Sequence, residues 1–160
     1  MFHRIVMALF LFFPLVTSAQ DVSVIYKGTS RYQSDILVTV RNGIVYKGRS
    51  NYQSDILCTV RGNAIYKGRS NYRSDVLYTL RDDAVYAGLS SYRSDIVMTL
   101  RGGEIYKGTS NYRSDILATN RSGKIYRGTS SYTSDILFTI DGVLTLPEFV
   151  AVWYAVTAGF

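Results

Sequence analysis

The sequence is poor in the residues on which most enzyme and metal sites depend. Its 160 residues include one histidine, one cysteine and two prolines. The histidine, His3, lies in the N-terminal apolar segment, so the rest of the chain has no imidazole for acid–base catalysis or for a typical zinc site. A single cysteine, Cys58, excludes thiolate metal clusters and internal disulfides. We therefore expect a non-enzymatic protein with no metal site and no cofactor.

Long apolar runs are also missing, except at the N-terminus. His3 and Arg4 precede the twelve-residue run "IVMALFLFFPLV", and the small residues Thr17 and Ala19 follow it. This order is typical of a secretory signal peptide, and the run is shorter than the roughly 20 residues of a membrane-spanning helix. The sequence predicts a signal peptide at residues 1–19, an exported protein (periplasmic, cell surface or secreted) and no spanning segment in the mature chain.

No block of like charge occurs. The chain has 18 basic and 12 acidic residues, and removal of Arg4 with the signal would leave 17 and 12, a net charge of about +5. The basic residues recur at equivalent repeat positions, which favours a solvated face over a nucleic-acid site. We expect no nucleic-acid partner.

The mature chain consists mainly of a tandem repeat. Six copies of a twenty-residue unit, V/I-Y-x-G-x-S-x-Y-x-S-D-I/V-L/V-x-T, follow one another without insertion from about residue 24. Segments such as "DILVTV" and "IVYKG" are β-branched and aromatic, as in strands. The "RNG", "RGN", "RDD", "RGG" and "RSG" segments between them are typical of tight hairpin turns. Residues 20–144 are therefore predicted to be an all-β domain of six β-hairpin repeats.

Two arrangements of these hairpins remain open. Nearly uniform copies favour closure around an axis, as in a propeller-like ring, because closure removes free strand edges. The alternative is a β-solenoid, which would stack six aspartates at about 4.8 Å spacing and would need atypical end copies. We expect the ring.

The polar connection "GTSRYQSD" and its equivalents contain the candidate site residues. Serine and aspartate in such loops accept hydrogen bonds from nearby backbone amides, so a structural turn-capping role is expected, with a calcium-binding ring of carboxylates as the alternative. These residues are Ser34, Asp35, Ser54, Asp55, Ser74, Asp75, Ser94, Asp95, Ser114, Asp115, Ser134 and Asp135.

The same connections contain a tyrosine in every copy, and an arginine follows it directly in three copies. Their ring faces and donors could bind sugars or another polymer as a multivalent array, or the tyrosines could pack between repeats while the arginines pair with the aspartates. The candidate ligand-binding residues are Tyr32, Tyr52, Tyr72, Tyr92, Tyr112, Tyr132, Arg73, Arg93 and Arg113.

The C-terminal segment 145–160 breaks the repeat. Thr145 and Glu148 form a capping-box pattern, Pro147 suits a first helical turn, and Gly159 can end a helix. We expect a short helix at 146–156 that is apolar nearly all round. It would be either a plug on the repeat domain or a docking segment for a membrane or a partner, including a second copy of the chain.

Together, the "SAQ" signal-peptide end, tandem units such as "IYKGTSNYRSDIL" and the final "PEFVAVWYAV" resemble the exported bacterial β-flower proteins. The resemblance covers residues 22–156. It implies short β-hairpins arranged around an axis and supplies no catalytic residue.

The leading functional hypothesis is a binding or structural module at the cell envelope, with a glycan or another envelope polymer as the candidate ligand. The alternative is a self-assembling, amyloid-like or oligomeric surface protein. An enzyme would need an acid–base pair that the sequence does not show. Cys58 occupies a variable slot of the repeat, filled elsewhere by Val38, Tyr78, Met98, Ala118 and Phe138, and is expected to be a buried free thiol.

Overall fold

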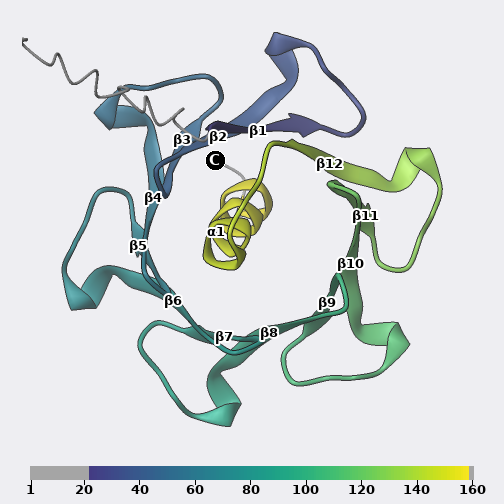
Figure 1. The fold of residues 1–160 in the computed structure, drawn as a ribbon. Helices are drawn as coiled ribbons and strands as arrows, with labels where there is room; N and C mark the ends of the chain where they lie inside the picture. The colour runs from purple at the N-terminus through teal and green to yellow at the C-terminus, as the bar shows by residue number, and fades with distance from the viewer. Residues whose placement is uncertain (1–21, 159–160) are drawn as a thin grey trace, which may run out of the picture.

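The computed structural model describes residues 22–158, in which twelve antiparallel strands form a closed barrel around one helix (Figure 1). The predicted signal peptide and Gly159 lie outside these residues. The strands are β1 (Val22–Lys27), β2 (Ile36–Arg41), β3 (Ile44–Lys47), β4 (Ile56–Arg61), β5 (Ala64–Lys67), β6 (Val76–Arg81), β7 (Ala84–Ala87), β8 (Ile96–Arg101), β9 (Glu104–Lys107), β10 (Ile116–Arg121), β11 (Lys124–Arg127) and β12 (Ile136–Asp141).

Each repeat contributes a long strand, a tight turn and a short strand. In the first hairpin, β2 pairs with β3 up to Arg41 and Ile44, and Asn42 and Gly43 form the two-residue turn with φ of 50° and 73°. Positive φ at both turn residues matches the right-handed twist of the flanking strands. The "RNG"-type segments are therefore hairpin turns, as predicted, and together they form one end of the barrel, called here the turn end.

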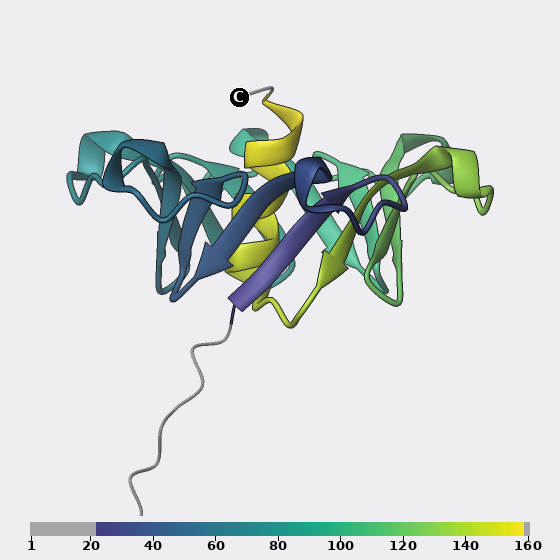
Figure 2. The ribbon, with the colours of Figure 1, turned by 90° about the horizontal axis from the view of Figure 1, so that it is seen from above.

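The other connection in each repeat projects outward from the barrel as a petal (Figure 2). The pairing between β3 and β4 shifts after Val45, so that Leu57 is an extra residue in its strand. Such a bulge bends a strand, and the same shift recurs in every repeat. The six petals comprise residues 28–35, 48–55, 68–75, 88–95, 108–115 and 128–135. Each contains a short 3-10 turn: Gln33–Asp35, Gln53–Asp55, Arg73–Asp75, Arg93–Asp95, Arg113–Asp115 or Thr133–Asp135.

The two ends of the described repeats close the ring. The first strand pairs with the last, with Val24 opposite Asp141 and Tyr26 opposite Thr139. Thr139 Oγ1 also donates to the carbonyl of Gly28, as the equivalent threonines do in the other repeats. Strand β1 therefore completes the sixth hairpin, which confirms the predicted ring and excludes the solenoid.

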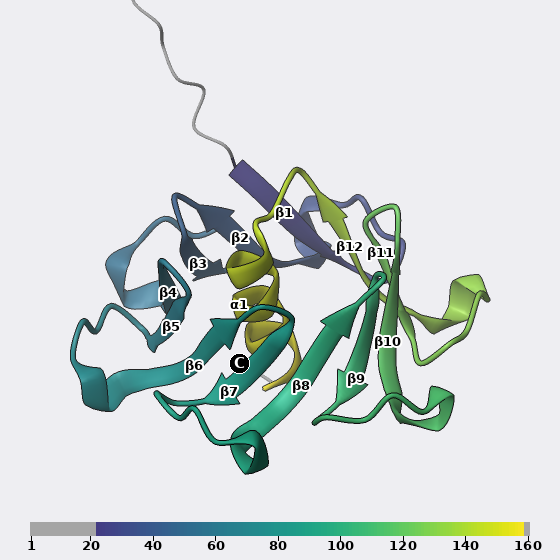
Figure 3. The ribbon, with the colours of Figure 1, turned by 60° about the horizontal axis from the view of Figure 1, so that its bottom comes forward.

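The C-terminal segment forms helix α1 (Leu146–Thr157) inside the barrel (Figure 3). Its capping box is present, because Thr145 Oγ1 accepts from the Glu148 amide and the Glu148 carboxylate accepts from the Thr145 amide. Val150, Ala151 and Val152 are fully buried. The helix is thus the plug of the barrel. Most of its apolar residues are buried in the barrel, although Leu146 is 42% exposed, and docking of this segment on a membrane or on a second copy stays a prediction.

The helix lies off centre, against β2, β3, β4 and β5. Cys58 on β4 is fully buried there, and its thiol donates to the carbonyl of Ala151 at 3.7 Å. Larger residues in the same slot contact the helix from other sides: Phe138 packs against Trp153 and Tyr78 against Tyr154. The variable slot therefore adapts a six-fold ring to a helix that has no such symmetry.

No helix within residues 22–158 has both the length and the apolar character needed to cross a membrane.

Candidate functional site

Each petal is held by a serine and an aspartate that together fix its backbone. In the third petal, Ser70 Oγ donates to Asp75 Oδ2 and accepts from the Tyr72 amide at 3.1 Å. The Asp75 amide donates to the carbonyl of Tyr72, which closes the 3-10 turn. Gly68 enters the petal with φ of 53°, a conformation that favours glycine. The same bonds recur in all six petals.

Within residues 22–158, the predicted capping of backbone amides is made neither by the aspartate side chains, which accept from serine hydroxyls, nor by the second serine of each petal. Ser34 and its equivalents are exposed, and those in the second and fourth petals bond only to the adjacent aspartate. The first serine of each petal accepts a backbone amide instead. It lies two residues before the tyrosine whose amide donates, which is the spacing of a serine turn. These serines are Ser30, Ser50, Ser70, Ser90, Ser110 and Ser130.

This turn places a tyrosine at the surface of every petal. The six rings have exposed fractions between 71% and 77%, so they do not pack between the repeats. The interpretation of these tyrosines as packing residues is therefore wrong. The exposed tyrosines are Tyr32, Tyr52, Tyr72, Tyr92, Tyr112 and Tyr132, and together they are called the petal tyrosines.

The petal arginines are also exposed. Arg73, Arg93 and Arg113 follow the petal tyrosines directly, and within residues 22–158 their side chains make no hydrogen bond or ion pair. The petal aspartates accept from serines and not from these arginines, so the expected pairing between the two sets is wrong. The rim of the barrel therefore presents six tyrosines and these three free arginines to solvent.

A second set of arginines, not identified from the sequence, lies on the outer face of the barrel. Arg101 lies over the ring of Tyr106, with its guanidinium carbon 4.8 Å from the ring centre, and four other repeats place arginine over tyrosine in the same way. Asp141 occupies this position in the last repeat, and Arg31 from the first petal lies over Tyr26 instead. These contacts fix the arginines, so they differ from the free petal arginines.

Comparison with known families identifies the group. A family model described as "6-fold beta flower protein" matches residues 25–153. The chain belongs to the beta flower proteins. No curated protein and no solved structure matches this beta flower protein.

Metal binding finds no support in the geometry of this beta flower protein. Among residues 22–158, no three histidine, cysteine, aspartate or glutamate side chains gather as metal ligands would. Each petal aspartate lies in its own petal and is bonded to its own serine. A shared carboxylate ring for calcium is therefore not formed.

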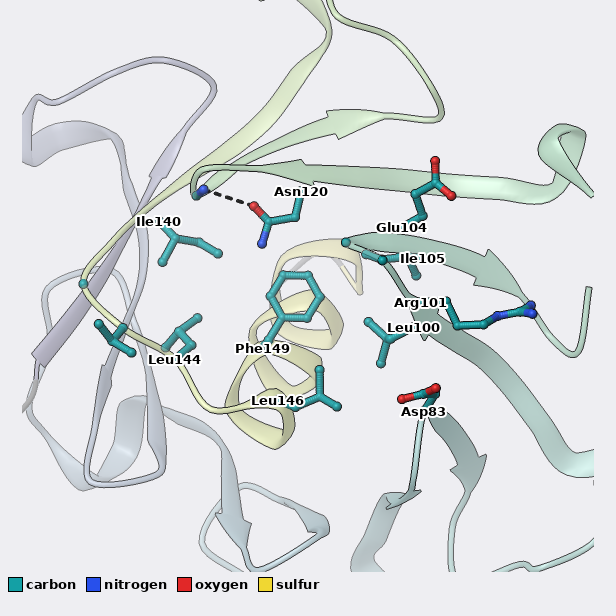
Figure 4. A pocket seen from close by; sticks show the side chains of 15 residues that line it. Asp83, Leu100, Arg101, Glu104, Ile105, Asn120, Ile140, Leu144, Leu146 and Phe149 are labelled. Carbon is teal, nitrogen blue, oxygen red and sulfur yellow. Dashed lines mark hydrogen bonds between the residues drawn. The ribbon is translucent and has the colours of Figure 1, made fainter. Parts of the chain in front are cut away.

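A cavity of about 590 Å³ lies at the turn end, on the side of α1 away from β2–β5 (Figure 4). No pattern in the sequence predicted this cavity. The available signal was Asn120, the one polar residue in a slot that is otherwise Val40, Val60, Leu80, Leu100 and Ile140.

Proposed function

We propose that this beta flower protein is an exported, non-enzymatic binding module whose petal tyrosines engage a repetitive polymer at the cell envelope, in the first instance a glycan. The observation that carries the proposal is the exposure of all six petal tyrosines on turns held by the same hydrogen bonds. A residue needed only for packing would be buried. A ring with an apolar face and a polar hydroxyl suits a sugar, whose faces alternate between C–H groups and hydroxyls.

Six equivalent sites on one rim favour a multivalent mode of binding. Each tyrosine alone would bind weakly, but a polymer that reaches several petals gains affinity through high effective concentration. Arg73, Arg93 and Arg113 add donors for sugar hydroxyls or for acidic groups on three neighbouring petals. A polymer with repeating units fits this arrangement better than a single small ligand does.

Other features support a module rather than an enzyme. The described residues contain no histidine, and the petal serines and aspartates that resemble catalytic groups bond to one another. Export is supported by the N-terminal sequence pattern. Strand-pairing assembly has no comparable support, because each of the twelve described strands is paired on both sides.

The test is a glycan and anionic-polymer array, with the wild-type chain and three variants compared by size-exclusion chromatography and thermal melting. We expect replacement of all six petal tyrosines by alanine to abolish binding without unfolding the barrel, and replacement of two to weaken it by one or more orders of magnitude. Arg73→Gln, Arg93→Gln and Arg113→Gln form the matched charge control, because glutamine is the residue at this position in the first two petals. Binding that the six-alanine variant retains, or no binding by the wild-type chain, would refute the proposal.

A further inference from the structure

We propose that the cavity beside α1 is a binding site for an uncharged, mainly apolar small molecule that carries a hydrogen-bond acceptor such as a carbonyl. This site is separate from the petals, since turn residues line it at the opposite ends of the strands. It therefore goes beyond the proposed polymer binding.

The cavity results from the mismatch between one helix and a six-fold ring. Helix α1 packs on β2–β5, and its other side faces β8, β10 and the chain after β12 across an open space. A volume of about 590 Å³ lies within the roughly 300–1,000 Å³ of small-molecule sites. The space is therefore large enough for a ligand of drug-like size.

The walls of the cavity are mainly apolar. Phe149 extends from α1 into its centre, and Leu100, Ile105 and Ile140 line the barrel side (Figure 4). At the mouth, Val143 and Leu146 have exposed fractions of 85% and 42%. A ligand that covered these side chains would remove apolar surface from water, which is the main driving force for binding of this kind.

The charged groups near the cavity do not favour a charged ligand. The Arg101 and Glu104 side chains point away from it in Figure 4. Arg101 lies over the Tyr106 ring, and Glu104 accepts from the Tyr106 hydroxyl. Asp83 lies at the edge. With both signs of charge outside and apolar walls inside, an ionised ligand would lose its hydration without gaining a partner.

Asn120, an exposed residue that lines the cavity, provides the polar contact. Its Oδ1 accepts from the Gly123 amide at 3.0 Å, and this bond orients the side chain so that the amide nitrogen points into the cavity toward Phe149 (Figure 4). No residue within 22–158 accepts from that nitrogen. The other five repeats have an apolar residue in this slot, so the fold itself does not require the asparagine. A donor placed at one point of an apolar cavity gives the orientation and selectivity that binding sites typically show.

The test uses two neutral fluorescent probes of similar size, one with a ketone and one without: 6-propionyl-2-dimethylaminonaphthalene and N-phenyl-1-naphthylamine. Both are titrated into the wild-type chain, and emission of the probe and of Trp153 is recorded. Trp153 is the only tryptophan and lies one helical turn from Phe149. We expect saturable binding of the ketone probe with one site per chain.

Three variants locate the site and assign the donor. Asn120→Asp keeps an oxygen for the Gly123 amide but removes the donor, and Asn120→Leu copies the residue of the third and fourth repeats. We expect each variant to lower the affinity for the ketone probe by about five- to tenfold, which corresponds to the loss of one hydrogen bond. We expect Asn120→Leu to leave the affinity for the probe without a ketone unchanged. Leu146→Trp should narrow the mouth of the cavity and lower the affinity for both probes.

Several results would overturn the proposal. Absence of saturable binding by either probe to the wild-type chain would show that the cavity is not a site. Binding unaffected by Leu146→Trp would place the probes elsewhere. If Asn120→Leu lowers the affinity for both probes equally and leaves the melting temperature unchanged, the donor role of Asn120 is refuted.

Discussion

At the scale of single residues, function and stability separate clearly within a petal. Ser70 and Asp75 bond to each other and to the backbone, whereas Tyr72 between them is 71% exposed. The neighbouring Ser74 makes no side-chain hydrogen bond within the described chain. Ser70 and Asp75 therefore stabilise the petal, and Tyr72 is exposed on its surface, although all three recur in every copy.

The serine pair within one petal gives a matched test of this division. Ser70→Ala removes a donor to Asp75 and an acceptor for the Tyr72 amide, and we expect it to lower the free energy of unfolding by about 1–3 kcal/mol. Ser74→Ala should change it by less than about 0.5 kcal/mol. Denaturant titrations of both variants measure the difference. Equal effects would contradict the assignment of Ser70 as the structural serine.

Cys58 gives a prediction about pH. Burial raises the pKa of its thiol from an ordinary value of 9.0 to about 12. The unfolded chain therefore releases the thiol proton first, and the stability of the folded state falls as the pH rises from about 9 to 12. The decrease contributed by this group is about 1.4 kcal/mol per pH unit at most.

Unfolding titrations at pH 8, 9, 10 and 11 on the wild type and on Cys58→Ala isolate this contribution, since tyrosines and lysines titrate in both. We expect the difference in stability between the two proteins to shrink toward high pH. A difference that stays constant would show that the thiol ionises in the folded barrel. In the folded protein at pH 8, we also expect no reaction of Cys58 with a thiol reagent.

At the scale of elements, α1 is the main contributor to the interior of the barrel. Its residues 149–153 are all buried, and its side chains contact strands from several repeats. The strands supply an inner surface that is nearly the same in each repeat. Because the single helix contacts each repeat differently, the repeats differ in the residues that face it, as at the position filled by Cys58 in one repeat and Phe138 in another.

Trp153 should be the most costly residue of α1 to truncate. It is 9% exposed and packs against Phe138, so Trp153→Ala leaves a cavity that the closed barrel cannot collapse around. We expect a loss of about 3–5 kcal/mol in the free energy of unfolding, measured by circular dichroism during denaturant titration. Leu146→Ala, on the same helix but 42% exposed, is the control and should cost less than half as much. A small effect of Trp153→Ala would show that the helix is only loosely held.

At the scale of the whole molecule, closure depends on pairing between the two ends of the repeat array. Strand β1 pairs with β12 across this seam, where Ile25 is fully buried and Arg31 forms an ion pair with Asp141 at 3.1 Å. The side chains of the ion pair are 63% and 57% exposed, so solvent screens most of their attraction. Burial and strand pairing hold the ring closed.

Two substitutions at the seam compare these contributions. We expect Arg31→Ala to change the free energy of unfolding by less than about 1 kcal/mol, and Ile25→Ala to lower it by about 2–5 kcal/mol. Because opening the seam exposes two strand edges, Ile25→Ala should also increase oligomer formation on size-exclusion chromatography. A larger effect of Arg31→Ala than of Ile25→Ala would mean that the ion pair controls closure.

The sequence by itself determined the repeat, its strands and turns and the capping box of α1, and it favoured the ring that the pairing of β1 with β12 then established. These features depend on local patterns: Asn42 and Gly43 favour a tight turn, and Thr145 with Glu148 begins a helix wherever the helix packs. The family match over residues 25–153 agrees with this local information. Repetition strengthened it, because each position could be judged in six copies.

Only the tertiary structure decided which polar residues are free and where the ring departs from symmetry. Ser30 and Ser34 are chemically alike, and their roles differ through the path of the backbone. Arg73 and Arg101 are likewise alike, but only Arg101 lies over a tyrosine ring. The cavity beside Asn120 depends on which side of the barrel α1 packs against. That choice is made by contacts between residues far apart in the chain, which no local pattern encodes.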